Sequence, residues 1–369
     1  MSELKVTIAS GIYPPDKGGP AQFASSFSHW LVSQGIPTTV VSLTDTDGYS
    51  RTEGNFRSIL ISRKSNLLLR YFYTVKTIIR SSKKHNLIIN GVFLETFIAS
   101  LVTPLKYIAK VPGDIVWERA RNQGETSLGI DEYQGTETFS KRMMRWFFVA
   151  SLKRSKAILA PSQHMSQLIS SWGVSPRKIH IVRNSVDLDL FSITEQPEKK
   201  FDLITVCRLT PWKGVSEIIK EASSRNLSLC VIGSGPELAT LKEQVKDSGA
   251  NVTFLGEVEQ RLIPNFLNQS RCFILNSSYE GSPHALLEAM ALGSLVIARD
   301  STGTREVVRD LDNGILCGEP RTLGAAIDIA FDKSKDIEGI KKAAASAIQN
   351  EYEREKVFRN ILNLIRESA

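Results

Sequence analysis

The sequence predicts an α/β protein built from two doubly wound parallel sheets, one in each half of the chain. Short apolar runs alternate with helix-prone segments, which is typical of parallel sheets covered by helices on both faces. The pattern starts again at Phe201, after a polar stretch that contains a proline. A chain of 369 residues is also longer than one ordinary hydrophobic core requires.

Each half supplies a series of expected strands. In the first half they are the runs LKVTIAS, TTVVSL, SILIS, NLIING, YIAKVP, AILAPS and KIHIVRN, with helices expected over residues 21–32 and 67–81. In the second half they are FDLITVCRL, LSLCVIG, VTFLG, CFILN, LVIARD and GILC. A charged amphipathic helix is expected at the end of the chain. We therefore expect domains over residues 1–187 and 188–349, followed by a terminal helix over 350–369.

Composition narrows the class of protein. A hydrophobic content of 42% with 23% charged residues is typical of a soluble globular chain. No apolar run approaches the ~20 residues that span a bilayer, and the first residues do not resemble a signal peptide. The four cysteines, Cys207, Cys230, Cys272 and Cys317, form no C-x-x-C pair. We expect free thiols, a reduced cytoplasmic setting and no cysteine metal centre.

The net charge of +7 is concentrated in the first half. Through residue 190 there are 24 Lys and Arg against 14 Asp and Glu, and the remainder has 22 against 25. The segment that begins at Arg57 and ends at Lys84 has eight cations and no acid, and the segment from Lys141 to Phe148 also mixes cations with aromatic rings. Such segments favour an anionic membrane surface, at the inner face of the plasma membrane. The alternative is core helices with solvated basic faces. No nucleic-acid-binding motif is present.

The run YEGSPHALLEAM, residues 279–290, has the strongest chemical pattern. Glu280 precedes a turn at Gly281, and Glu288 lies eight residues further on. Ser282 is expected as the helix N-cap and Pro283 as the first helical residue. The free N–H groups of the first turn, including those of His284 and Ala285, would bind phosphate or sugar oxygens, and the carboxylates would accept hydrogen bonds from sugar hydroxyls.

A second group of candidates follows the first strand of the second half. Arg208 and Lys213 fall beyond the carboxyl end of that strand, where ligands bind in open α/β sheets. A fixed guanidinium and a flexible ammonium suit a diphosphate whose charge grows as it departs. Two solvated loop cations are the alternative.

Together these motifs resemble those of retaining, nucleotide-sugar-dependent glycosyltransferases of the GT-B fold, particularly glycosyltransferase family 4. The resemblance implies two Rossmann-like domains facing a central cleft, transfer with retention, no cofactor and no metal. It assigns Arg208 and Lys213 to the departing diphosphate and Glu288 to the ribose. Glu280 would hold the donor sugar or the positive charge that develops at its anomeric carbon. UDP and GDP donors stay equally open. A surface helix that happens to carry two acids is the simpler alternative.

Three weaker motifs are also similar to the family. Gly233 lies in a G-x-G-P-E step near the nucleotide, and Val258 would contact the base. Gly18 and Gly19 form a loop expected near the diphosphate and acceptor, where an ordinary β–α turn is the alternative. Many family members have a histidine where this chain has Asp114. Asp114 would orient or deprotonate the acceptor hydroxyl, or would cap the following helix; both roles stay open.

The implied function is transfer to a glycan or lipid-linked glycan in bacterial surface polysaccharide synthesis. A nucleotide-sugar 2-epimerase of the same architecture and a catalytically silent scaffold are the competing hypotheses. The D-x-D pattern at Asp45 and Asp47 is typical of metal sites in another fold, and here we interpret it as a solvated loop. The five histidines have no ligand-like spacing.

Overall fold

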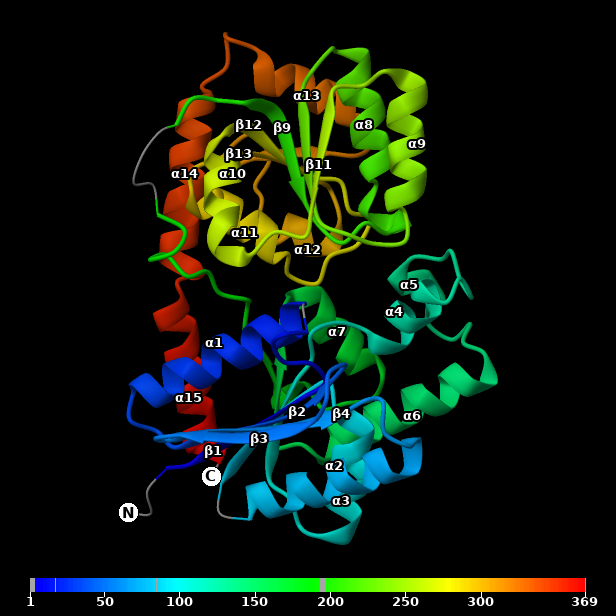
Figure 1. Cartoon of the computed structure of the whole chain (residues 1–369), viewed down its shortest axis with the longest axis vertical. Coiled ribbons are helices and arrows are strands. Elements are labelled where there is room, and N and C mark those ends of the chain that lie inside the picture. The colour runs from blue at the N-terminus through cyan, green and yellow to red at the C-terminus, as the bar shows by residue number, and fades with distance from the viewer. Residues whose placement is uncertain (1–3, 17, 84, 193–196, 369) are drawn as a thin grey trace. The chain divides into compact units, whose positions relative to one another are not determined.

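The computed structural model describes residues 4–16, 18–83, 85–192 and 197–368. Lys17, Lys84 and residues 193–196 of the expected linker lie outside the described residues. The chain forms two compact units (Figure 1). The first comprises Met1–Arg183 with Phe358–Ala369, and the second comprises Asn184–Val357. The division falls close to the boundary that the sequence predicts at residue 187.

The first unit is built on a sheet with strand order β3-β4-β2-β1-β5-β6-β7-β8. Its strands are parallel except for β3, which pairs antiparallel with β4. The strand bounds are β1 Val6–Ser10, β2 Thr38–Thr44, β3 Tyr49–Glu53, β4 Phe56–Ser62, β5 Asn86–Asn90, β6 Tyr107–Lys110, β7 Ala157–Ala160 and β8 Ile179–Ile181. The helices are α1 Gly19–Ser33, α2 Leu67–Ser82, α3 Phe93–Val102, α4 Ile115–Asn122, α5 Ile130–Tyr133, α6 Phe139–Arg154, α7 Gln163–Ser171 and the 3₁₀ turn η1 Pro176–Lys178.

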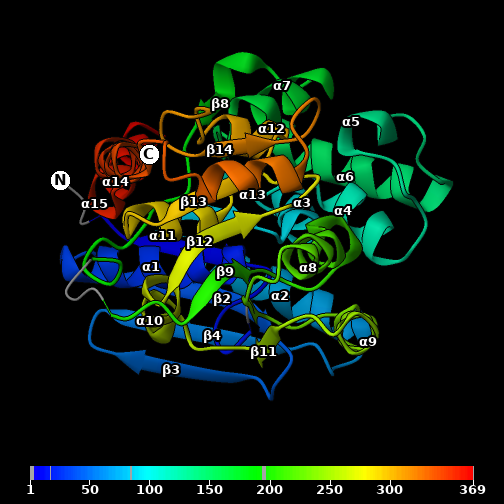
Figure 2. The ribbon, with the colours of Figure 1, turned by 90° about the horizontal axis from the view of Figure 1, so that it is seen from above.

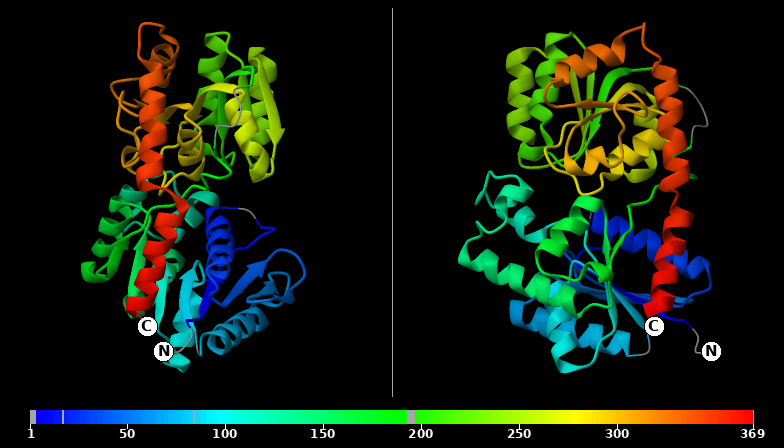
Figure 3. Two further views of the ribbon diagram at one scale, coloured as in Figure 1. Left: turned by 90° about the vertical axis from the view of Figure 1, so that its left-hand side faces the viewer. Right: turned by 180° about the vertical axis from the view of Figure 1, so that it is seen from behind.

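The aromatic face of α1 is buried, as its spacing predicts. Phe23 and Phe27 lie one turn apart with ring centroids 5.5 Å from each other. Phe358 of α15 (Arg354–Ser368) packs edge-on against Phe27 at 5.1 Å, and Figure 3 shows α15 beside α1. The last residues of the chain therefore complete the core of the first unit.

The second unit is built on an all-parallel sheet with strand order β11-β10-β9-β12-β13-β14 (Figure 2). Its strands are β9 Phe201–Val206, β10 Leu229–Ile232, β11 Val252–Gly256, β12 Ser270–Leu275, β13 Leu295–Arg299 and β14 Ile315–Cys317. Its helices are η2 Pro211–Lys213, α8 Val215–Ser224, α9 Leu238–Ser248, η3 Gln260–Leu262, α10 Ile263–Asn268, α11 His284–Ala291, α12 Thr302–Arg305, α13 Leu323–Phe331 and α14 Ile337–Glu351.

Alternating side chains of these strands fill two separate cores. Cys230 and Phe273 lie in a cluster with residues of α10, α11 and α14. Their neighbours Val231 and Ile274 lie in a cluster with residues of α8, α9 and α13. The period of two therefore places a helical layer on each face of the sheet. Both clusters are apolar, which explains why the strands appear in the sequence as continuous apolar runs.

The predicted α/β class with two Rossmann-like sheets is confirmed. Strand β3 is not among the predicted strands, because all five of its residues are exposed and a strand without a buried face has no hydrophobic period. A turn at Gly54, whose φ is +56°, returns the chain to β4. A single terminal helix is predicted over residues 350–369. In the structure α14 ends at Glu351, and the terminal helix, α15, begins at Arg354.

No helix in the described part of the chain has the length and hydropathy that crossing a bilayer requires. The four cysteines are free thiols, and Cys230, Cys272 and Cys317 are buried, as their apolar contexts predict.

Candidate active site

The candidate site lies where the strand order of the second sheet reverses direction. β9 and β12 are neighbours in the sheet, and the chain leaves them toward opposite edges. Their carboxyl ends therefore form a topological switch point, the position at which ligands bind in open α/β sheets. Two loops begin there, residues 207–214 after β9 and residues 276–283 after β12. They contain Arg208, Lys213 and Glu280.

A lysine and a glutamate join the two loops. Lys213 Nζ lies 2.5 Å from Glu280 Oε1, and the side chains are 17% and 12% exposed. The backbone adds a second link, because Ser278 N donates to Trp212 O at 2.8 Å. The two candidates come from positions far apart in the sequence, and the fold brings them together. A partly buried ion pair of this kind fixes both charged groups at the strand ends.

A polar network beneath the loops holds them in place. Asn276 Nδ2 donates to Gly214 O at 3.0 Å and to Glu217 Oε2 at 2.9 Å. Arg299 donates to Asn276 Oδ1 and forms an ion pair with Glu217. Sequence reasoning missed these residues because each belongs to a different element and has no motif of its own.

Close backbone contacts make two glycines obligatory in this region. A Cβ at Gly233 would lie 1.9 Å from Cys207 O, and one at Gly303 would lie 1.9 Å from Glu280 O. Gly233 also has a φ of +130°. The contact between the loops therefore requires glycine at position 233, and contact of Gly233 with a nucleotide stays a prediction. Gly303 was not predicted; it supports the loop that holds Glu280.

The helix after Glu280 begins one residue later than predicted. α11 starts at His284, and Pro283, with φ −78° and ψ 106°, occupies the N-cap position. The prediction of Ser282 as N-cap and Pro283 as first helical residue is therefore wrong. The Ser282 peptide instead continues the loop, where Ser282 O accepts from Asn184 Nδ2 at 2.8 Å. No described side chain caps α11, so the N–H groups of its first turn keep the positive end of the helix dipole.

Glu288 lies in the second turn of α11 and is only 7% exposed. Its Oε1 accepts a hydrogen bond from Gln260 Nε2 at 3.0 Å. Gln260 begins η3, two residues after Val258, which packs partly buried against the core beneath α11. Gln260 was not predicted, and it ties the helix of Glu288 to the loop of Val258.

Other polar groups at these strand ends have no hydrogen-bond partner in the described part of the chain. Arg208 is exposed and forms neither an ion pair nor a hydrogen bond with any described side chain. The hydroxyls of Thr210 and Ser277 are buried and unpartnered among those residues. Groups of this kind are expected where a polar ligand binds.

Burial raises the pKa of Cys207 to about 11, so its thiol stays protonated at neutral pH and is no nucleophile.

Asp114 belongs to the first unit and is completely buried. Its carboxylate accepts from Val116 N at 3.0 Å and from Trp117 N at 3.2 Å, which caps α4. Arg145 binds both of its oxygens at 2.7 Å, and Gln134 Nε2 donates at 3.0 Å. Helix capping, one of the two predicted roles, is what these contacts show. Participation in acceptor deprotonation stays a prediction.

The glycine loop of the first unit forms the start of α1. Gly18 is the N-cap of the helix with a φ of +138°, and Gly19 is its first residue. A residue with a Cβ would be strained at Gly18, and its Cβ would lie 3.1 Å from Ile12 Cδ1. The local geometry therefore requires glycine there. Contact of Gly18 and Gly19 with a ligand stays a prediction.

The D-x-D carboxylates form ion pairs. Asp45 pairs with Arg63 at 2.7 Å, and Asp47 lies 4.0 Å from Lys64. Among residues 4–16, 18–83, 85–192 and 197–368, no cluster of His, Cys, Asp or Glu could hold a metal ion.

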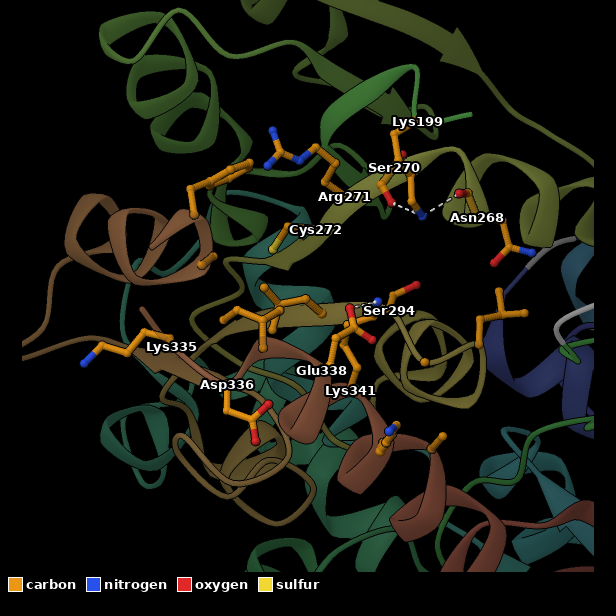
Figure 4. A pocket seen from close by; sticks show the side chains of 18 of the residues that line it. Lys199, Asn268, Ser270, Arg271, Cys272, Ser294, Lys335, Asp336, Glu338 and Lys341 are labelled. Atoms are coloured by element: carbon orange, nitrogen blue, oxygen red, sulfur yellow. Dashed lines mark hydrogen bonds and ion pairs between the residues drawn. The ribbon is translucent and has the colours of Figure 1, made fainter. Parts of the chain in front are cut away.

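A cavity of about 920 Å³ lies at the opposite edge of the second sheet (Figure 4). Lys199 and Ser294 line it just before β9 and β13, and Ser270 lines it at the start of β12. Lys199 Nζ donates to Asn268 O at 2.7 Å and Ser270 O at 3.0 Å. The predicted site residues lie at the other ends of these strands, so this cavity is separate from the candidate site.

Two family models match adjacent segments of the sequence. The model described as Glycosyltransferase Family 4 matches residues 129–190, and the model described as Glycosyl transferases group 1 matches residues 188–356. The second match contains both loops of the candidate site, residues 207–214 and 276–283. Residues 129–356 are therefore of the glycosyltransferase group 1 and family 4 type, and the chain has the GT-B fold.

Individual relatives agree with this class. An uncharacterised glycosyltransferase of Methanocaldococcus jannaschii is 24% identical, with 100% of this chain and 95% of the relative covered. An amylovoran biosynthesis glycosyltransferase of Erwinia amylovora is 23% identical over 58% of this chain and 57% of its own length. Among solved structures, Anabaena HepE in complex with UDP and glucose has a TM-score of 0.78 at 15% identity, covering 99% of this chain and 100% of that one. The structural likeness shows the fold.

Proposed function

We propose that the chain transfers a sugar from a nucleoside diphosphate donor to a hydroxyl of a glycan or lipid-linked glycan, with retention at the anomeric carbon. The observation that carries the proposal is the Lys213–Glu280 pair at the strand ends of the second sheet, followed by Glu288 on an uncapped helix. The pair joins a cation to a carboxylate at these strand ends, and Glu288 lies on the helix that follows Glu280. The UDP and glucose bound to the structural relative support a nucleotide-sugar donor.

The departing diphosphate would be stabilised by Arg208 and Lys213. Arg208 is exposed and unpaired among the described residues, so its guanidinium is available for bidentate contact with phosphate oxygens. Lys213 is held at the strand ends by Glu280. Charge that grows on the leaving oxygen is best stabilised by cations already in position, and the first turn of α11 adds its dipole. This set of groups would neutralise the leaving group without a metal.

The sugars of the donor would bind to the two carboxylates. Glu288 would accept hydrogen bonds from the ribose hydroxyls, and Gln260 would orient it. Glu280 would hold the transferred sugar or the positive charge that develops at its anomeric carbon. Its backbone is fixed by the contact with Gly303. The peptide groups of residues 281–285 would bind sugar hydroxyls or phosphate, and Val258 would contact the base.

Bacterial surface polysaccharide synthesis is the setting we propose, because a matched relative acts in amylovoran biosynthesis. The test incubates purified protein with a panel of UDP- and GDP-sugars, with and without glycan acceptors. Released nucleoside diphosphate measures turnover, and the anomeric coupling in the product's NMR spectrum reports its configuration. We expect release that depends on Glu280 and a product with the configuration of the donor.

The same experiment separates the competing hypotheses. Nucleotide binding without turnover would identify a scaffold protein, and a sugar altered at its second carbon would identify an epimerase. Either outcome, or a product of inverted configuration, would contradict the proposal. Glu280→Gln is the informative variant because it keeps the size of the side chain and removes its charge. Glu243→Gln, at an exposed position on α9 of the same unit, is the matched control.

A further inference from the structure

Three helices of the first unit pack side by side, with α3 in contact with both α2 and α6. Figure 1 shows them together on the side of the sheet away from α1. We call the surface formed by their outward side chains the α2–α3–α6 face. All of this face belongs to the first unit.

Apolar side chains are concentrated on this face. Ten of the fifteen exposed large hydrophobic residues in the described part of the chain lie on these three helices. Leu68 is 78% exposed, Val102 is 72% exposed and Phe139 is 81% exposed. The first two turns of α2 point outward and contribute little to the core, because the buried residues of that helix are Thr74 and Ile78. Apolar surface gathered in this way marks an interaction site.

Cations are interleaved with these apolar side chains. Lys76 Nζ lies 5.4 Å from the ring centroid of Phe72, and the guanidinium of Arg154 lies 5.7 Å from that of Phe97. Neither α2 nor α6 contains an acidic residue. A groove of about 680 Å³ along α6 is lined by Trp146, by Phe97 of α3 and by four cations, of which Arg145 is paired with Asp114.

We propose that the α2–α3–α6 face docks on an anionic lipid surface. Aromatic and aliphatic side chains enter the headgroup boundary, while neighbouring cations attract the lipid charge. Charge decides against a second copy of the chain, because a self-complementary contact would bring two acid-free basic helices together. The proposal extends the sequence-based expectation, since α3 supplies part of the surface and was not included in it. It does not depend on the proposed reaction.

The test measures binding of the full-length chain to vesicles by co-sedimentation. Phosphatidylcholine vesicles are compared with vesicles that also contain phosphatidylglycerol, at low and high salt. We expect binding only to the anionic vesicles, and weaker binding at high salt because the cations are screened. Failure to bind anionic vesicles, or equal binding to both types, would overturn the proposal.

Two sets of variants locate the surface. The apolar set replaces Leu68, Phe72 and Phe139 with Ser, and its control replaces the exposed residues Tyr49, Ile181 and Leu262 with Ser. The charge set replaces the exposed cations Arg80, Arg142 and Lys153 with Gln, and its control replaces the exposed cations Lys220, Lys242 and Lys333 with Gln. We expect each set to weaken binding at least about tenfold and each control to change it less than about twofold.

Two further outcomes would contradict the proposal. One is binding that falls equally in a set and its control, since general stickiness or net charge would then explain it. The other is a concentration-dependent dimer that the apolar set dissociates in light scattering, which would identify a second copy as the occupant. Melting temperatures of all variants are compared with the wild type, so that a folding defect is not mistaken for lost binding.

Discussion

The carboxyl edges of the two sheets have similar topology and different chemistry. In the first unit, Asp114 is completely buried and its oxygens are engaged by Arg145, Gln134 and two backbone N–H groups. In the second unit, Lys213 and Glu280 are partly exposed, Arg208 has no partner among the described residues, and α11 has no side-chain cap. An edge whose charges satisfy one another stabilises the fold. An edge with available charges is suited to bind a ligand.

Replacement of Asp114 should have the largest effect on stability. We expect Asp114→Ala to lower the free energy of unfolding by about 3 kcal/mol, because the largely buried Arg145 would lose its bidentate partner and keep only Glu137, at 3.2 Å. Denaturant unfolding measures the change. Asp45→Ala is the control; Asp45 is 75% exposed and also pairs with an arginine, so its loss should cost at most about 1 kcal/mol. Lost turnover at unchanged stability would show that Asp114 acts in catalysis.

Arg208→Ala should have the opposite effect, with a large loss of turnover and no loss of stability. We expect turnover to fall about hundredfold to thousandfold, because a preorganised cation at the leaving group would be lost. The melting temperature should stay unchanged, since Arg208 is exposed and unpaired among the described residues. Lys220→Ala, on the exposed side of α8, is the control for a lost surface cation. Full activity in Arg208→Ala would contradict the proposal that the loop after β9 binds the diphosphate.

The pH dependence of stability tests Lys110, which lies at the carboxyl edge of the first sheet. It is buried at the end of β6, 4.5 Å from the ring centroid of Phe23, and burial lowers its pKa to about 8. Between about pH 8 and 10 the unfolded chain therefore binds more protons, and stability should rise with pH. Relative to Lys110→Met, we expect the wild type to gain up to about 3 kcal/mol over this range. Parallel pH profiles for the two proteins would contradict this prediction, and exposed Lys106→Met should leave the profile unchanged.

Ser282 should show the smallest effect on stability. Its hydroxyl caps no helix, so Ser282→Ala should change the free energy of unfolding by less than about 0.5 kcal/mol. Ser162 is the matched comparison, because its hydroxyl accepts from Met165 N at 3.2 Å and caps α7. Ser162→Ala should cost about 1 kcal/mol. Equal losses of unfolding free energy in the two variants, measured by thermal unfolding, would support the capping role that the sequence predicts for Ser282.

Much of the fold could be predicted because buried parallel strands appear as continuous apolar runs. The predicted ends of those strands also located Arg208, Lys213 and Glu280, since carboxyl ends of parallel strands share one edge. Long-range polar contacts could not be predicted in this way. Asn276, Gln260 and Gly303 have no local pattern, and their roles arise only when separate loops meet.

Local patterns were also ambiguous about which role a residue takes. Ser-Pro before a helix predicts a serine cap, yet here the loop continues through Ser282 and the helix begins at His284. Asp114 was compatible with capping or catalysis, and only its contacts with Arg145 and Gln134 reveal how fully its oxygens are engaged. Burial and partner geometry distinguish such roles, and both depend on residues distant in the sequence.

The most direct test asks which edge of the second sheet binds the nucleotide. Calorimetric titration of UDP and GDP compares the wild type with Lys213→Ala at the carboxyl edge and Lys341→Ala in the cavity at the amino edge. The two lysines are matched, since each is partly buried and pairs with a glutamate. We expect Lys213→Ala to weaken binding at least about tenfold and Lys341→Ala to change it less than about twofold. The reverse pattern would place the nucleotide in the amino-edge cavity and contradict the proposed donor site.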